Sequence, residues 1–150
     1  MHDIEINSFT EGLKLAKDEF YIDAIDVFNK LINDYPDSEL ADDALYNMAL
    51  CFFKMNQFSK AIEFFNKVIH EYPHATISIL DGGNEFGKTA AKCYLAIVNC
   101  SLAMGDVEKA KETADQISEF ENSYILIEDV KHSFYDLAKN AIQTYINCTD

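Results

Sequence analysis

Apolar side chains recur every three or four residues along most of this chain, the spacing of one face of an α-helix. The region between the two Tyr-Pro pairs shows the pattern most clearly. Its first half has an apolar face made of Leu45, Met48, Ala49 and Phe52. After a polar break at 55–57, a second face contains Phe58, Ala61, Ile62, Phe65, Val68 and Ile69. Pro73 ends this stretch, because proline disfavours the helical conformation of the residue before it. The pattern predicts two antiparallel helices joined by a tight turn.

The helix pair is repeated. Residues 18–36, DEFYIDAIDVFNKLINDYP, align without gaps on residues 55–73, MNQFSKAIEFFNKVIHEYP, with a period of 37 residues. A third copy, GDVEKAKETADQISEF, places Ala110 where the second has Ala61, an offset of 49 residues. The larger offset requires an insertion before the third copy. We therefore expect repeats at about 5–36, 38–73 and 87–122 and an insert at about 75–86.

One more helical pattern follows the third repeat, at about 124–147. Its spaced apolar positions are Ile127, Val130, Phe134, Leu137, Ala138, Ala141, Ile142 and Tyr145. An array of repeats needs a terminal element with one wet face. The expected fold is an all-α solenoid of three antiparallel helix pairs plus a C-terminal capping helix, in one domain over 1–150.

The repeated residues A-I-x-x-F-N-K-x-I-x-x-Y-P, and M-G-D-V-E-K-A in the third copy, resemble the tetratricopeptide repeat (TPR) family. The linker Y-P-D-S-x-x-A-D-D-A-L-Y is similar to that of bacterial envelope-type members. The resemblance implies a non-catalytic interaction module or scaffold whose leading helices line a concave groove for a partner's peptide or helix. Carried over by register, the partner-binding residues are Phe9, Leu13, Lys17, Asp43, Tyr46, Leu50, Phe53, Lys54, Lys92, Leu95 and Asn99.

Family members that grip a chaperone's C-terminal carboxylate use Lys, Asn and Arg side chains on these helices. By register, this chain has Asn47 and Lys92 at two of the positions. The other three positions hold Phe9, Leu13 and Ala96. The resemblance therefore favours an apolar anchor over a terminal carboxylate. The apolar stripe that we expect to be partly exposed contains Phe9, Tyr46, Leu50, Phe53 and Leu95.

A phosphate-loop pattern, G-x-x-x-x-G-K-[ST], is present at Gly82–Thr89, directly after the β-branched run ATISIL. Such a loop holds phosphate only between a strand and a helix of a parallel sheet. The rest of the chain has helical spacing, and the repeat register places Gly87 at the start of a helix. We therefore interpret the pattern as a coincidence, and keep a nucleotide-binding protein that uses Gly82–Thr89 as the alternative hypothesis.

The net charge of −14 disfavours nucleic acid and favours a basic or apolar protein partner. No apolar run approaches the roughly 18 residues of a membrane span, so no membrane insertion is expected. The N-terminus, MHDIEINSFTEG, lacks the features of a signal peptide. We expect a cytoplasmic protein; the alternative is a periplasmic protein whose signal peptide has been removed.

The four cysteines, at 51, 93, 100 and 148, lack the spacing of a zinc site, and we expect buried free thiols. No set of residues has the spacing of a catalytic triad or of an acid/base pair. We accordingly predict no catalytic residues, no metal site and no cofactor. A homo-oligomer, in which the capping helix of one chain packs on the next, is a further alternative.

Overall fold

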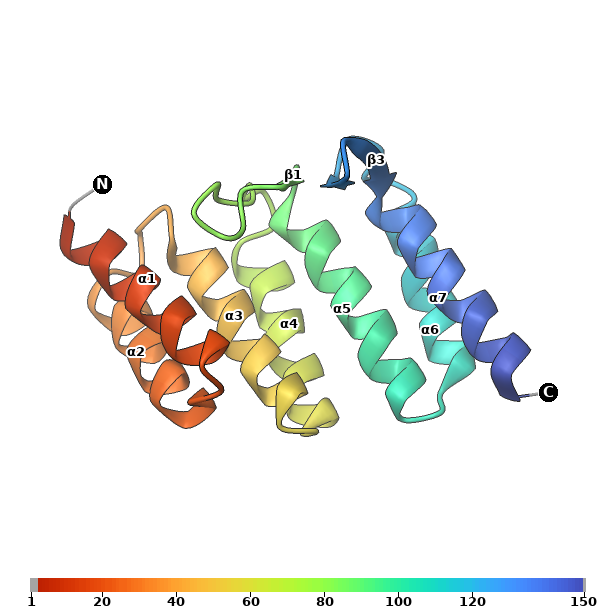
Figure 1. Ribbon diagram of the computed structural model, residues 1–150, viewed down its shortest axis with the longest axis horizontal. Helices are drawn as coiled ribbons and strands as arrows, with labels where there is room; N and C mark the ends of the chain where they lie inside the picture. Colours follow the sequence, from red (N-terminus) through yellow and green to blue (C-terminus); the bar gives the residue numbers. More distant parts are fainter. Residues whose placement is uncertain (1–2, 150) are drawn as a thin grey trace.

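The computed structural model describes residues 3–149, and within them seven helices form a row of antiparallel pairs (Figure 1). The helices are α1 (Asp3–Lys17), α2 (Tyr21–Asp34), α3 (Ala41–Lys54), α4 (Phe58–Glu71), α5 (Thr89–Ala103), α6 (Val107–Ile117) and α7 (Phe134–Thr149). In each of the three pairs the odd-numbered helix comes first in the chain and is called the leading helix. The even-numbered helix that follows it is called the trailing helix. The predicted fold, three helix pairs plus a C-terminal capping helix, is confirmed.

The repeated residues of the trailing helices form the inner side of each pair. In α2 the buried residues are Ala24, Phe28 and Leu31, and in α4 they are Ala61, Phe65 and Val68, each 37 positions later. The small alanine lets the leading helix come close, while each fully buried phenylalanine contributes roughly 1.5–3 kcal/mol. In the third pair the equivalent residues of α6 are Ala110, Ala114 and Ile117.

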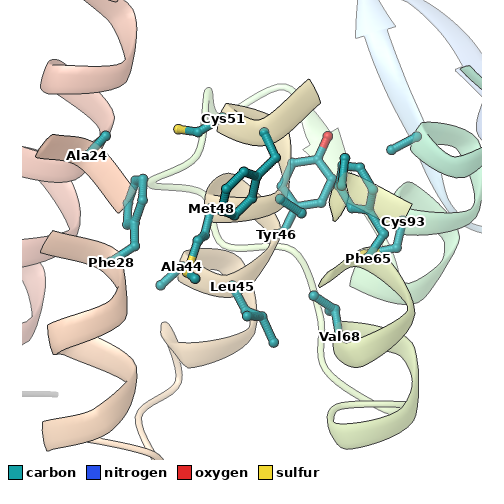
Figure 2. Close-up of a cluster of buried hydrophobic side chains, with 14 of the residues drawn as sticks. Ala24, Phe28, Ala44, Leu45, Tyr46, Met48, Cys51, Phe65, Val68 and Cys93 are labelled. Atoms are coloured by element: carbon teal, nitrogen blue, oxygen red, sulfur yellow. The ribbon is translucent and has the colours of Figure 1, made fainter. Parts of the chain in front are cut away.

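Two hydrophobic clusters fill the interior, and α5 contributes to both. The first, shown in part in Figure 2, joins Phe28 of α2 and Phe65 of α4 through the buried face of α3, and it reaches Cys93 of α5. The second lies between α5, α6 and α7 and includes Val98 of α5 and Phe134 of α7. Because α5 is buried on opposite sides, it carries apolar residues almost all round.

The row of helices is curved. The leading helices contact one another in the order α1, α3, α5, and α5 contacts α7. In the described part of the chain, no contact of similar extent joins α2 to α4 or α4 to α6. The leading helices are therefore closer together than the trailing ones, so they line the concave side.

The capping helix begins later than predicted, which is a correction to the expected range of about 124–147. Residues 124–133 form a β-hairpin, with β2 (Tyr124–Ile127) antiparallel to β3 (Val130–Ser133). The two turn residues, Glu128 and Asp129, have φ values of 51° and 64°, as two-residue hairpin turns require. Ile127 and Val130 fit helical spacing and strand ends equally well, so the apolar pattern alone was misleading.

The insert joins this hairpin along the edge of the solenoid where α5 and α7 begin (Figure 1). Its short strand β1 (Glu85–Phe86) pairs antiparallel with β2, which makes a three-stranded sheet in the order β1-β2-β3. The side-chain amide of Asn84 also donates to the Leu126 carbonyl at 3.2 Å. The insert is thus an ordered layer over the ends of α3 and α5 rather than an open loop.

Three of the four cysteines are buried free thiols, as predicted, but Cys148 is exposed. Burial raises the pKa of the Cys51 thiol to about 11 and that of Cys100 to about 12. These thiols therefore stay protonated and act as small core residues. Between residues 3 and 149, no helix has both the length and the apolar character needed to cross a bilayer.

Candidate functional site: a groove along the leading helices

Two adjoining cavities lie between the leading helices, and together we call them the inner groove. The cavity between α3 and α5 has a volume of about 90 Å³ and is lined by Tyr46, Leu50, Phe53, Glu85, Lys92, Leu95, Ala96 and Asn99. The cavity between α1 and α3 has a volume of about 200 Å³ and is lined by Ala16, Lys17, Tyr21, Asn47, Leu50, Cys51 and Lys54. Leu50 of α3 lines both cavities, so the two adjoin at this residue.

Most of the residues predicted to bind a partner line this groove, but Phe9, Leu13 and Asp43 do not. Phe9 is fully buried, with its ring centroid 6.0 Å from that of Phe28, so its predicted exposure is wrong. The reason is Gly12, one turn later, where a Cβ atom would overlap the Phe28 ring. This glycine lets α2 pack closely against α1, so the face of α1 that carries Phe9 is buried in the core. Leu13 is half-buried against the same cluster.

Three residues of the predicted apolar stripe lie partly open to the groove. Leu50, Phe53 and Leu95 are half-buried, which leaves part of each side chain open to the groove. Tyr46 is only 7% exposed, because its ring packs against Phe65 at a centroid distance of 5.4 Å. It therefore forms the floor of the groove rather than an exposed anchor.

Charged side chains close one end of the groove. The Lys92 ammonium is buried, and it pairs with Asp81 at 3.0 Å and with Glu85 at 2.7 Å. It also lies over the Tyr46 ring, 4.1 Å from the centroid. Burial disfavours the ammonium, but Tyr46, Asp81 and Glu85 together raise the pKa of Lys92 above its ordinary value. Lys92 is therefore charged at every physiological pH.

Two more carboxylates lie buried beside this network, on the first turn of α3. Asp43 accepts a hydrogen bond from the Ser78 backbone N–H at 3.3 Å, and burial with Asp42 nearby raises its pKa to about 8. Burial likewise raises the pKa of Asp42, which accepts a 2.6 Å hydrogen bond from the Thr89 hydroxyl. Asp43 was predicted to contact a partner; at 1% exposure it instead holds the insert.

The residues of the phosphate-loop pattern have other contacts in this fold. Lys88 precedes the first turn of α5, and its ammonium donates to the His74 carbonyl at 3.1 Å. Thr89 is fully buried, so its hydroxyl cannot reach a bound magnesium ion. Gly87, with φ of 110°, packs against Ser123 so closely that a Cβ would come within 2.5 Å of the Ser123 Cα. The geometry gives no support to the nucleotide-binding alternative.

Sequence reasoning missed the contribution of the insert, above all Asp81 and Glu85. A signal was present: Lys92 falls on the inner face of the third leading helix, where a lysine needs a nearby carboxylate to be buried. The insert runs into the N-terminal end of that same helix. Its two acidic residues on either side of Gly82 and Gly83 were therefore natural candidates.

A larger hollow of about 700 Å³ lies outside the groove, between the loops 36–42 and 71–78. Its rim carries the carboxylates of Asp37, Glu39 and Glu71. Within residues 3–149, no group of three or more His, Cys, Asp or Glu side chains has an arrangement that could hold a metal ion. We therefore assign the candidate site to the inner groove.

The curved row of helix pairs with a groove along its leading helices defines a helical-repeat solenoid. Two sequence profiles of the tetratricopeptide repeat match the chain, over residues 42–74 and 22–38. Residues 22–38 and 42–74 are therefore tetratricopeptide repeats, which confirms the resemblance drawn from the sequence. No curated protein matches it in sequence.

Solved structures with the same fold include three TPR proteins. The first TPR domain of Spaghetti (RPAP3), bound to the HSP90 peptide SRMEEVD, has a TM-score of 0.65 and 18% identity over 97% of this chain and 92% of that chain. The Sgt2 TPR domain from Aspergillus fumigatus has a TM-score of 0.66 and 16% identity. The match covers 97% of this chain and 81% of that chain. The Hsp90 co-chaperone Cns1 from Saccharomyces cerevisiae has a TM-score of 0.68 and 17% identity. The match covers 97% of this chain but only 40% of the Cns1 chain.

Proposed function

We propose that the protein is a non-catalytic interaction module, or scaffold, that binds a peptide or helix of a partner protein in the inner groove. One observation carries the proposal: Leu50, Phe53 and Leu95, from two different leading helices, line a single cavity and remain half-buried. Partly solvated apolar side chains in a concave site are typical of the positions where a partner's apolar anchor binds.

The chemistry of the groove favours an anchor that is apolar. The cavity between α3 and α5 has a floor formed by the Tyr46 ring and walls formed largely by aliphatic and aromatic groups, with the paired charges of Lys92 and Glu85 at one end. The net charge of −14 repels an acidic partner and attracts a basic one at long range. We infer a partner segment with an apolar side chain for this cavity and basic residues outside it.

The similarity to the Spaghetti domain supports peptide binding but not the same peptide. That domain is bound to the acidic peptide SRMEEVD. In this chain Asn47 and Lys92, the two side chains suited to a peptide carboxylate, both donate to the carboxylate of Asp81. SRMEEVD is therefore a useful negative probe, and we expect the unmodified protein to bind it weakly.

The experiment selects short peptides from a random displayed library on the purified protein and measures their affinity for two matched variants. Phe53→Ala removes a half-buried ring from the groove, whereas Phe64→Ala removes a half-buried ring from trailing helix α4, where it stacks on Phe52. Loss of an aromatic anchor costs about 2 kcal/mol, so Phe53→Ala should weaken binding roughly 30-fold. Phe64→Ala should leave the affinity nearly unchanged.

Circular dichroism of both variants checks that the helices persist. The proposal is wrong if the selected peptides bind Phe53→Ala as tightly as the unmodified protein, or if Phe64→Ala loses as much affinity while both remain folded.

A further inference from the structure

The part of the insert nearest the groove is a loop, residues 78–83, whose base is firmly anchored. Backbone hydrogen bonds join Ile77 N–H to the Gly87 carbonyl at 2.9 Å and Thr89 N–H to the Ala75 carbonyl at 3.0 Å. Ile77 is also buried in the second hydrophobic cluster. The two ends of the loop are thus fixed close together, while the loop itself extends beyond them.

Apolar burial does not hold the tip of this loop. Ile79 is 75% exposed and Leu80 is 36% exposed, so neither contributes much hydrophobic stabilisation. Gly82 and Gly83, with φ of 84° and 78°, make the following turn. Segments with little apolar burial open at low free-energy cost. The position of the tip therefore depends on polar contacts.

Ser78 fixes the start of the loop through its N–H, which donates to Asp43, and Asp81 makes the polar contacts nearer the tip. Its Oδ2 accepts hydrogen bonds from the Asn47 amide and from the Lys92 ammonium, both at 3.0 Å. Asn47 and Lys92 belong to different leading helices, and each lines one cavity of the inner groove. The carboxylate of Asp81 thus bridges α3 and α5 beside the inner groove, joining one lining residue of each cavity.

We propose that the 78–83 loop is an intramolecular competitor: Asp81 occupies the carboxylate-binding position of the inner groove, and a carboxylate-bearing partner binds only by displacing it. The proposal rests on the proposed function of the groove and adds a selection among partners, because only a partner with a carboxylate must displace the loop. Exchange of one carboxylate for another leaves the charge around Lys92 unchanged, since Glu85 stays paired with it at 2.7 Å. Displacement therefore involves the loop alone, and an apolar partner without a carboxylate binds with the loop in place.

The experiment measures SRMEEVD binding by calorimetry to the unmodified protein, to Asp81→Ala and to Asp37→Ala. Asp37 is an exposed loop aspartate outside the groove, so its removal changes the net charge equally. Asp81→Ala should bind the peptide at least about tenfold more tightly than Asp37→Ala, the effect of a freed charge-assisted hydrogen bond. The C-terminally amidated peptide tests whether the gain comes from the terminal carboxylate or from a glutamate side chain, and Lys92→Met added to Asp81→Ala should abolish the gain.

The proposal is overturned if folded Asp81→Ala binds the acidic peptide no better than Asp37→Ala. If Asp81→Ala loses helicity, Asp81→Asn, which keeps the size but not the charge, takes its place with the same expected direction. Failure here leaves the proposed function standing as long as selected apolar peptides still require Phe53. If those peptides do not require Phe53, the proposed function itself has failed.

Discussion

Replacement of Asp43 by asparagine should stabilise the protein, increasingly so as the pH rises. Asp43 is 1% exposed, and while Oδ1 accepts from Ser78, its Oδ2 atom has no hydrogen-bond partner. Burial is the main cause that raises its pKa from 3.8 to about 8, with the neighbouring Asp42 and Asp81 carboxylates adding to the effect. Asparagine keeps an oxygen for the Ser78 N–H and introduces no charge to be desolvated.

The sign follows from proton binding. Between about pH 4 and pH 8, the folded protein holds a proton on Asp43 that the unfolded chain has released, because the pKa is about 8 in one and near 3.8 in the other. The free energy of unfolding therefore falls as the pH rises, by up to about 1.4 kcal/mol per pH unit. Between pH 5 and pH 7 the Asp43 contribution amounts to roughly 3 kcal/mol, and above pH 8 it levels off.

Urea unfolding of the unmodified protein and of Asp43→Asn at a series of pH values from about 5 to 9 measures this contribution. The difference between the two free energies of unfolding should widen by roughly 2–3 kcal/mol between pH 5 and pH 7 and then stay constant above pH 8. Asp37→Asn, at an exposed loop position, serves as the control and should show no such trend. A difference that does not change with pH would refute the reasoning, because Asp43 would then titrate alike in both states.

Two further predictions concern the start of α5. Thr89→Val should lower stability by about 1–3 kcal/mol in urea unfolding, because it leaves the buried Asp42 carboxylate without its hydroxyl donor; an unchanged midpoint would contradict the assigned hydrogen bond. Gly87→Ala should cost more than about 2 kcal/mol, because a side chain at φ of 110° is strained and its Cβ meets Ser123. Gly83→Ala, where a Cβ has 3.5 Å to the nearest atom, is its control and should be the milder change in thermal unfolding.

The sequence predicted the helices and their pairing because the repeat carries local information. Ala24, Phe28 and their counterparts 37 residues later mark both the buried face and the close approach of each pair. The groove positions of Leu50, Phe53 and Leu95 followed from that register. These features depend on spacing within one or two helices, which is visible in a single chain.

Features that depend on distant contacts were not predictable in the same way. Phe9 was placed in the groove because its register fits, but Gly12 admits Phe28 and turns this face inward. The strands at 124–133 depend on pairing with Glu85 and Phe86, some 40 residues earlier. The burial of Lys92 depends on where the insert folds: the position of Lys92 on the inner face of α5 indicates a need for carboxylates but does not identify Asp81 and Glu85 as their source.

The small sheet also affects how the solenoid comes apart. In most helical-repeat proteins each unit contacts only its neighbours, so units are lost one at a time from either end. Here β1 connects the insert to the hairpin that precedes α7, and the Ser123 hydroxyl accepts from the Lys88 N–H at 3.0 Å. The C-terminal half, from the insert through α7, is thereby cross-linked into one cooperative unit, whereas the main contacts of α1 and α2 outside their own pair are, among residues 3–149, with α3. Unfolding should consequently be directional, with the first helix pair fraying and the last three helices separating together.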